Sequence, residues 1–523
     1  MPVQFEIHPT IGISRLGTSE GFFFGPEPDA PPPASYRDEG GILRQAARFR
    51  IFRVERDMTG AVVTANEITS DAADIEWTVH LANRKAAAFR MFQQTPTRRN
   101  NATGDEQADQ ALIIDPGPRS VSGSVPSAVF DSGTFRGVPV PLGEARFQAK
   151  TGRLLVLGGR GLSAFVEPAS SVLQDFADND GWFDDTAEGP ISATVTLKAT
   201  GERLEVSGAR VIVAPPDFAP EIQNFVTLYD VVYQMALDNG LVPRPSTFSF
   251  MRFVHPILMR ASGYRWVNAA AASRHGGSAR MNFAASMDRF GDPRKSLALR
   301  RRVFSVLRDP QRTATDAAPA MPRLFAVEGY PEREYRPLAL TPIQYEAISK
   351  WATVPDTPPD FVWDSPRDPW AGQSLPDALD RVALEACAGG AFFPGIEAPH
   401  FIADGNNFES TLPVRLRNTL PAGTVNAASA VPWQADFFQC RWEGGASEDG
   451  LEAFLGQDND YGWWPAQRPD SVFTDPSLET RVKWDAGVGT MDEMVTAWTR
   501  LGFVLRSSNA RGETIFIQHK PET

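Results

Sequence analysis

The sequence predicts an α+β fold, in which a strand-rich N-terminal half is integrated with a helical, loop-rich C-terminal half. Up to Val213, short runs alternate apolar with charged or polar residues, and residues 44–53 are a clear example. Alternation of this kind is typical of half-buried strands. From Phe225 onward, apolar residues recur instead at helical spacing. Runs of strands followed by runs of helices are the pattern of an α+β protein.

Individual elements follow from the same patterns. In the first half, strands are expected at residues 44–53, 112–114, 145–148, 153–157, 193–197, 203–206 and 209–213. In the second half, helices are expected at residues 225–236, 253–261, 296–308, 342–351 and 377–387. Proline-rich stretches near residues 215–220 and 356–368 are candidate boundaries. They would divide the chain into a strand-rich lobe (1–217), a helical region (218–360) and a cofactor-bearing C-terminal region (361–523). The alternative is that all three form one integrated domain.

Composition excludes several classes of protein. The 523 residues carry a formal net charge of −13, which argues against a general role in binding nucleic acid. The basic cluster Arg300-Arg301-Arg302 is interpreted as a solvated helix face. No apolar run is long enough for a membrane-spanning helix, and the N-terminus has no signal-peptide pattern. We therefore expect a protein of the cytoplasm by default, with export by another route left open.

Most motifs that carry chemistry are missing from the sequence. It contains no zinc motif H-E-x-x-H, no nucleophile elbow G-x-S-x-G and no dinucleotide fingerprint, so neither a metal nor bound NAD or flavin is predicted. The glycine cluster at residues 158–161 fits a tight turn. The acidic segment 178–185 fits a loop whose aspartates cap turns, with a structural cation as the alternative. A cysteine hydrolase using Cys387 or Cys440 stays open as a further alternative.

One stretch, residues 431–470, holds an unusual combination of reactive side chains. Cys440 is one of only two cysteines, Asp436 lies four residues before it, and the pair Trp463-Trp464 follows. If residues 433–440 are helical, Asp436 and Cys440 share one face of the helix. A thiol can bond to an indole ring, and oxidation of that ring gives an ortho-quinone. These residues therefore allow a carbonyl electrophile to be built from the protein's own side chains.

The same stretch resembles the LodA-like family of cysteine tryptophylquinone oxidases, the relatives of lysine ε-oxidase and glycine oxidase. Residues 430–440, with Val431-Pro432-Trp433-Gln434-Ala435-Asp436, and residues 463–469, with Trp463-Trp464-Pro465-Ala466-Gln467, carry the resemblance. It extends over nearly the whole chain through further blocks at residues 11–17, 45–50, 80–85, 115–119, 157–161, 179–182, 214–220, 226–230 and 386–395. Many blocks in one order are far more specific than a single motif.

The resemblance implies a role for each matching residue. Cys440 would supply the sulfur of the thioether, and Trp464 or Trp463 would become the quinone, with Trp464 favoured. Asp436 matches the carboxylate proposed to assist crosslinking and to take protons during turnover. Cys387 matches a second cysteine near the cofactor, and Tyr229 matches a position near the substrate pocket. Ordinary core positions for these last two residues are the alternative.

The resemblance further implies a quinoprotein that oxidatively deaminates a primary amine of an amino acid with O2, releasing ammonia and hydrogen peroxide. Relatives need a separate flavoprotein for maturation, and we expect a homo-oligomer that binds neither nucleic acid nor membrane. The interval between Cys440 and the tryptophan pair is short for the family. The alternative from another class is a non-catalytic relative that keeps the fold, lacks the mature quinone and acts as a binding or structural protein.

Overall fold

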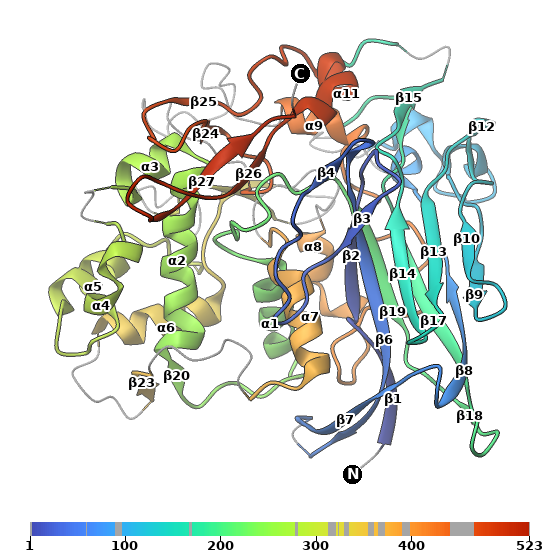
Figure 1. The fold of residues 1–523 in the computed structure, drawn as a ribbon, viewed down its shortest axis with the longest axis horizontal. Helices are drawn as coiled ribbons and strands as arrows, with labels where there is room; N and C mark the ends of the chain where they lie inside the picture. The colour runs from blue at the N-terminus through green and yellow to red at the C-terminus, as the bar shows by residue number, and fades with distance from the viewer. Residues whose placement is uncertain are drawn as a thin grey trace.

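The computed structural model describes residues 3–58, 60–88, 97–166, 170–277, 281–311, 321–322, 324–328, 334–353, 360–364, 372–389, 398–439 and 465–521. Figure 1 shows the strands of the first half forming one large twisted sheet, while the helices of the second half gather beside it. The α+β prediction is confirmed. Among the described residues, no helix is both long and apolar enough to cross a bilayer.

The sheet of the first half contains 13 strands among the described residues, and its central path runs β10-β13-β14-β6-β2-β19-β17-β8-β9. Neighbours on this path are antiparallel except β19 and β2, which pair in parallel from Arg210↔Ile11 to Ala214↔Arg15. The strands of this sheet are β1 (Val3–His8), β2 (Ile11–Arg15), β3 (Phe22–Phe24), β6 (Arg44–Arg56), β7 (Val62–Ile68), β8 (Ala73–Val79), β9 (Arg119–Ser122), β10 (Ser127–Val129), β13 (Gly143–Gln148), β14 (Arg153–Gly158), β17 (Ala187–Leu197), β18 (Arg203–Leu204) and β19 (Ala209–Ala214).

Small two-stranded ribbons complete the β structure. They comprise β4 (Arg37–Asp38) with β5 (Gly41–Ile42), β11 (Thr134–Phe135) with β12 (Val138–Pro139), β15 (Ser163–Phe165) with β16 (Trp182–Asp184), β20 (Phe248–Ser249) with β23 (Phe361–Val362), β21 (Phe325–Glu328) with β22 (Glu334–Pro337), β24 (Ser471–Phe473) with β25 (Arg481–Lys483), and β26 (Phe503–Ser508) with β27 (Thr514–His519). The last ribbon lies near the C-terminus and crosses the top of the helical half in Figure 1.

The described α-helices all follow residue 227. They are α1 (Leu228–Asp238), α2 (His255–Gly263), α3 (Ala269–His275), α4 (Met287–Phe290), α5 (Leu297–Ser305), α6 (Pro342–Thr353), α7 (Leu375–Glu385), α8 (Pro399–Ile402), α9 (Trp433–Gln439) and α11 (Met491–Ala497). Each of the five predicted helical segments overlaps one of them, namely α1, α2, α5, α6 or α7. The predicted strand at residues 112–114 is wrong, because a short 3-10 helix, η3 (Gln110–Leu112), ends there and only Ile114 forms an isolated bridge, to Asn83.

Helix α7 joins the helical half to the sheet. Its Asp380 accepts hydrogen bonds from the backbone N–H of Thr10 (2.7 Å) and contacts Nδ1 of His8 (3.0 Å), whose Nε2 in turn contacts Glu6 (3.0 Å). His8 is fully buried, and burial opposes its protonation; the two flanking carboxylates outweigh that penalty, so the pKa of His8 is raised. A charged cluster of this kind fixes α7 against the end of β1.

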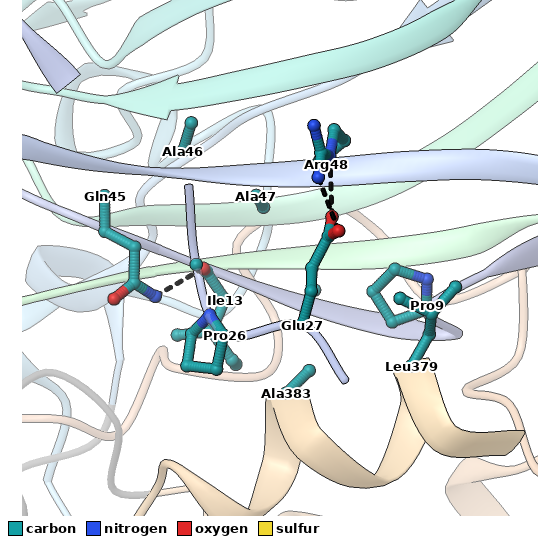
Figure 2. Close-up of a pocket in the computed structure, with 12 residues that line it drawn as sticks. Pro9, Ile13, Pro26, Glu27, Gln45, Ala46, Ala47, Arg48, Leu379 and Ala383 are labelled. Atoms are coloured by element: carbon teal, nitrogen blue, oxygen red, sulfur yellow. Dashed lines mark hydrogen bonds and ion pairs between the residues drawn. The ribbon is translucent and has the colours of Figure 1, made fainter. Parts of the chain in front are cut away.

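A small cavity of about 350 Å³ lies between α7 and the sheet. Figure 2 shows Leu379 and Ala383 of α7 below strands that carry Ile13, Ala46 and Ala47. Its charged residues, Glu27 and Arg48, are paired with each other, and Glu27 is also paired with Arg50. Because its lining is mostly apolar and its charges are already paired, this cavity offers little chemistry.

The start of α1 contacts the segment that follows α7. Thr227 caps α1 in a capping box with Asp230, and the backbone N–H of Leu228 donates to the carbonyl of Cys387 at 3.0 Å. A Cβ atom on Gly389 would lie 1.9 Å from the carbonyl oxygen of Thr227, so a glycine is needed for this close approach. The segment after α7 is thereby held against the first turn of α1.

Candidate active site

Helix α9 carries the carboxylate of the sequence signature, and its apolar face is buried. Trp433 and Phe437 are fully buried, one turn apart, with their ring centroids 5.0 Å apart. Asp436, on the same helix, is 1% exposed. Of the residues 433–440 considered as a helix, 433–439 are helical, and Cys440 lies outside the described residues.

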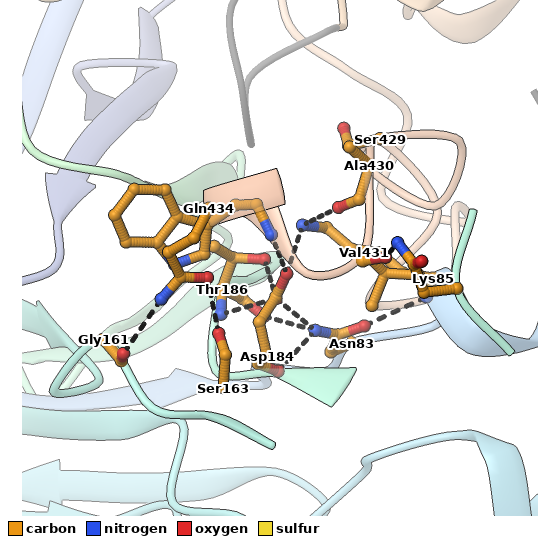
Figure 3. A network of polar contacts seen from close by, with 12 residues as sticks. Asn83, Lys85, Gly161, Ser163, Asp184, Thr186, Ser429, Ala430, Val431 and Gln434 are labelled. Carbon is orange, nitrogen blue, oxygen red and sulfur yellow. Dashed lines mark hydrogen bonds and ion pairs between the residues drawn. The ribbon is translucent and has the colours of Figure 1, made fainter. Parts of the chain in front are cut away.

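The start of α9 is held by a buried ion pair from the sheet half. Figure 3 shows Lys85 and Asp184 meeting beneath the segment that leads into the helix. Lys85 Nζ lies 3.0 Å from Asp184 Oδ2 and donates to the carbonyl of Ala430 at 2.9 Å. The same carboxylate oxygen accepts the backbone N–H of Trp433 at 3.0 Å. A carboxylate at this position satisfies a free N–H of the first helical turn and complements the helix dipole.

Further hydrogen bonds complete this network. Asn83 and Thr186 donate to Asp184 Oδ1 at 3.1 Å and 2.7 Å. On α9, Gln434 accepts a hydrogen bond from Ser163 at 2.6 Å and donates to the carbonyl of Gly161. The sheet half thus sets both the position and the orientation of the helix that carries Asp436.

Replacement of Lys85 by methionine is expected to destabilise the protein by about 3–5 kcal/mol, because Asp184 would keep a buried charge without its cation. Urea unfolding followed by circular dichroism measures this change. Lys198→Met is the matched control, since the Lys198–Asp74 pair is exposed and should contribute at most about 1 kcal/mol. Equal losses in the two variants would contradict the role assigned to Lys85.

The second flank of the signature, residues 465–468, packs directly against α9. Arg468 is fully buried; its Nε donates to the carbonyl of Phe437 at 2.7 Å, and its Nη2 lies 2.7 Å from Asp485. Next to it, the carbonyl of Gln467 accepts the backbone N–H of Phe218 at 3.0 Å. Trp463 and Trp464, which immediately precede this flank, lie outside the described residues.

Cys387 lies beside the same flank in a buried polar cluster. Its Sγ is 3.9 Å from Nη2 of Arg15, and the neighbouring carbonyl of Ala386 accepts a hydrogen bond from Gln467 at 3.2 Å. Burial, reinforced by the charge of Asp217, raises the pKa of the Cys387 thiol to about 11, although Arg15 opposes the rise. The thiol is therefore protonated at neutral pH, which argues against Cys387 as the nucleophile of a hydrolase.

Asp217 completes this cluster. It is buried 3.8 Å from Arg15, and burial raises its pKa to about 6 even though Arg15 and hydrogen bonds from Ala219 and Gln467 lower it. A carboxyl group with this pKa can bind or release a proton near neutral pH. Neither Asp217 nor Gln467 was singled out by sequence reasoning as a functional residue, because Arg15 and Gln467, which contact Asp217, are each more than 200 residues away from it along the chain.

Tyr229 lies on α1 and lines a separate cavity between α1, α2, α6 and α7. Its ring stacks on that of Tyr233 at 6.2 Å with an interplanar angle of 9°. Burial raises the pKa of Tyr229 to about 12, so its hydroxyl is neutral. Cys387, which follows α7 by two residues, does not line this cavity, although Glu385 at the end of α7 does. Tyr229 and Cys387 are thus near each other in the fold but face different surroundings.

The acidic segment 178–185 is used for turns and anchoring. Asp175 and Asn179 accept backbone N–H groups of their own loop, Asp180 accepts the N–H of Asn100, and Asp184 holds α9. Among the described residues, no cluster of side chains is suited to a metal ion. The turn-capping interpretation accounts for the contacts of Asn179, whereas Asp180 and Asp184 bind backbone N–H groups of distant segments.

Two family models match the sequence. The model of the L-lysine ε-oxidase N-terminal domain covers residues 8–213, and that of the L-lysine ε-oxidase C-terminal domain covers residues 326–464, together well over half of the chain. The chain belongs to the LodA-like family. The second match ends at Trp464, so it includes Asp436, Cys440 and the tryptophan pair of the LodA-like signature.

Individual relatives agree with this LodA-like assignment. An L-lysine 6-oxidase of Marinomonas mediterranea is 30% identical over 329 residues, which span 51% of this chain and 43% of that protein. The match thus covers less than half of the relative. Two solved structures of L-Lys ε-oxidase from the same organism share the fold over 98% of this chain and 94% of their own chains. One has a TM-score of 0.75 at 21% sequence identity. The other, a Schiff base intermediate with L-Lys, has a TM-score of 0.74 at 22% sequence identity.

Proposed function

We propose that this chain is an amino-acid oxidase that uses a cysteine tryptophylquinone formed from Cys440 and Trp464, with Trp463 as the alternative ring. It would act on a primary amine of a free amino acid and use O2, releasing ammonia and hydrogen peroxide. Membership of the LodA-like family supports the proposal. A separate flavoprotein would oxidise the side chains, and the mature protein would be a homo-oligomer.

The hydrogen bond from Arg468 to Phe437 is the observation that carries the proposal. Cys440 follows Phe437 by three residues, so the chain allows it to lie at most about 10 Å from Phe437. Trp464 precedes Arg468 by four residues, so the chain allows it to lie at most about 14 Å from Arg468. The two flanks of the signature are therefore held close enough for a thioether to join them. The residues present fit the group.

A quinone at this position would supply a carbonyl electrophile for a primary amine and would accept two electrons from it. The described residues supply the setting for that chemistry. Asp436, which is buried on α9, would take the proton from the carbon that bears the amine. Arg15 and Gln467 both donate hydrogen bonds to the carbonyl of Ala386, which fixes the tryptophan flank against the end of α7, and Asp217 can exchange a proton beside them. Their burial keeps water away from the reacting groups.

The alternative is a non-catalytic LodA-like protein that never forms the quinone. Intact mass separates the two possibilities, because crosslinking removes two hydrogens and conversion of the indole to a quinone adds two oxygens and removes two more hydrogens. Protein produced together with its flavoprotein partner should show this mass change and visible absorbance, whereas protein produced alone should keep the mass of the sequence. An unchanged mass in both preparations would favour the non-catalytic alternative.

A further inference from the structure

The cavity lined by Tyr229 has an empty volume of about 520 Å³ and a mixed lining. One side is apolar, with Phe253, Ile257 and Ile343. The other side carries charged residues from α1, α2 and α7, together with Arg252 of the preceding π-helical turn η4 (Phe250–Val254). A ligand that fits this lining has an aliphatic part and at least one charged group.

The acidic side chains of the cavity are already paired. Arg260 Nη1 lies 2.7 Å from Asp230 Oδ2, and its Nη2 lies 3.6 Å from Glu385 Oε1. Arg381 Nε lies 2.8 Å from the same Glu385 oxygen. These four residues therefore form a part of the cavity lining that has no net charge, because two guanidinium groups neutralise the two carboxylates.

Arg252 is different, because no described carboxylate lies within ion-pair distance of it. Its guanidinium lies over the rings of Tyr233 (5.8 Å) and Phe253 (5.2 Å), and its side chain is exposed to solvent. Stacking on aromatic rings holds the guanidinium in place while leaving its N–H groups available. One net positive charge thus remains in the lining of the cavity.

A second polar group in the lining is also unused. The hydroxyl of Thr341 is buried and has no hydrogen-bond partner among the described residues, while its backbone N–H donates to Gln344. A buried hydroxyl without a partner costs free energy unless a ligand or water satisfies it. It is therefore available to a ligand oxygen at the same cavity.

We propose that this cavity binds the carboxylate of the amino-acid substrate through Arg252, which makes Arg252 the residue that distinguishes an amino acid from the corresponding simple amine. The inference rests on the proposed oxidase function for its link to turnover. A guanidinium fork matches the geometry of a carboxylate, and the apolar wall of Phe253, Ile257 and Ile343 accommodates the aliphatic part.

Described contacts connect this cavity to the candidate quinone. Glu385 lines the cavity, and the carbonyl of the next residue, Ala386, accepts a hydrogen bond from Gln467 at 3.2 Å. Gln467 follows Trp464 by three residues. The backbone that borders the cavity is therefore in direct contact with the segment that leads away from the tryptophan pair.

The test compares Arg252→Gln with Arg244→Gln in the full-length chain. Arg244 is paired with Glu346 beside the cavity but does not line it, so its replacement is the matched control for loss of charge. Hexanoate binding, measured by isothermal titration calorimetry, should weaken about tenfold in Arg252→Gln and stay unchanged in Arg244→Gln. Equal affinity of wild type and Arg252→Gln for hexanoate, or no binding to wild type, would overturn the proposal.

Turnover supplies the second measurement. For the mature protein, Arg252→Gln should raise KM about tenfold for a free amino acid and leave KM unchanged for the amine formed by its decarboxylation. Equal effects on both substrates would overturn the assignment of Arg252. If the mature chain turns over neither substrate, the proposed oxidase function fails, while the calorimetric result still decides whether the cavity binds a carboxylate.

Discussion

Replacement of Cys440 by alanine is expected to abolish the visible absorbance and the peroxide release completely, because the sulfur of the thioether would be lost. The fold should survive. Helix α9 is fixed by Lys85 and Asp184, and the tryptophan flank is fixed by Arg468, none of which depends on the thiol. The measurement is the absorbance spectrum, the intact mass and peroxide release of protein produced together with its flavoprotein partner.

Cys387→Ala is the matched control, since it removes the only other thiol of the chain. The Cys387 sulfur is buried beside Arg15 and Ala383, and its raised pKa keeps it protonated. This variant should keep the crosslinked mass and the absorbance. A Cys440→Ala protein that still showed the quinone, or a Cys387→Ala protein that lost it, would show that the sulfur was assigned to the wrong residue.

Most of the strands and helices that local sequence patterns predicted are present in the structure. Strand β6 was predicted at residues 44–53 and spans Arg44–Arg56, and helix α6 was predicted at residues 342–351 and spans Pro342–Thr353. In both segments the period of the apolar residues is sustained over ten or more residues. A long period of this kind distinguishes a strand from a helix without reference to the rest of the chain.

The errors occur where only a short residue pattern was available to predict the type of element or the exposure of a side chain. Residues 112–114 form an apolar run too brief to distinguish a strand from a turn of helix, and the structure has η3 up to Leu112. The basic cluster at 300–302 was interpreted as a solvated face. Arg301 and Arg302 are exposed, but Arg300 is 1% exposed and lies over the ring of Trp363 at 4.7 Å. Charge alone does not show which arginine of a run has an aromatic partner.

The surroundings of the candidate site depend on distant pairings. Asp184 was interpreted as part of an acidic loop, yet it binds Lys85, 99 residues earlier, and the N–H of Trp433, 249 residues later. No local spacing connects these three residues. Likewise, Arg252 can be recognised as a candidate ligand-binding residue only from the fold, because the fold shows that the nearby carboxylates of Asp230 and Glu385 are bound by Arg260 and Arg381. Sequence patterns supplied the candidate reactive residues, whereas the groups around them could be found only from the structure.

Asp436→Asn is expected to lower kcat by about 10²–10⁴-fold, because asparagine cannot take the proton from the carbon that bears the amine. The two side chains have nearly the same shape, and Asp436 lies on a helix whose start is fixed from outside, so the fold and the packing of Trp433 and Phe437 should be preserved. Peroxide release per mole of quinone measures the effect. Substrate deuterated at that carbon should show a larger isotope effect on kcat in the variant.

Normalisation to the quinone content is essential, because Asp436 can also assist formation of the crosslink. Intact mass gives the crosslinked fraction of each preparation, and only that fraction enters kcat. If the crosslinked Asp436→Asn protein turns over at the rate of wild type, Asp436 is not the base. If instead no crosslinked protein forms, the carboxylate acts in maturation, and Asp436→Glu, which restores the acid on a longer side chain, should recover part of the crosslinked mass.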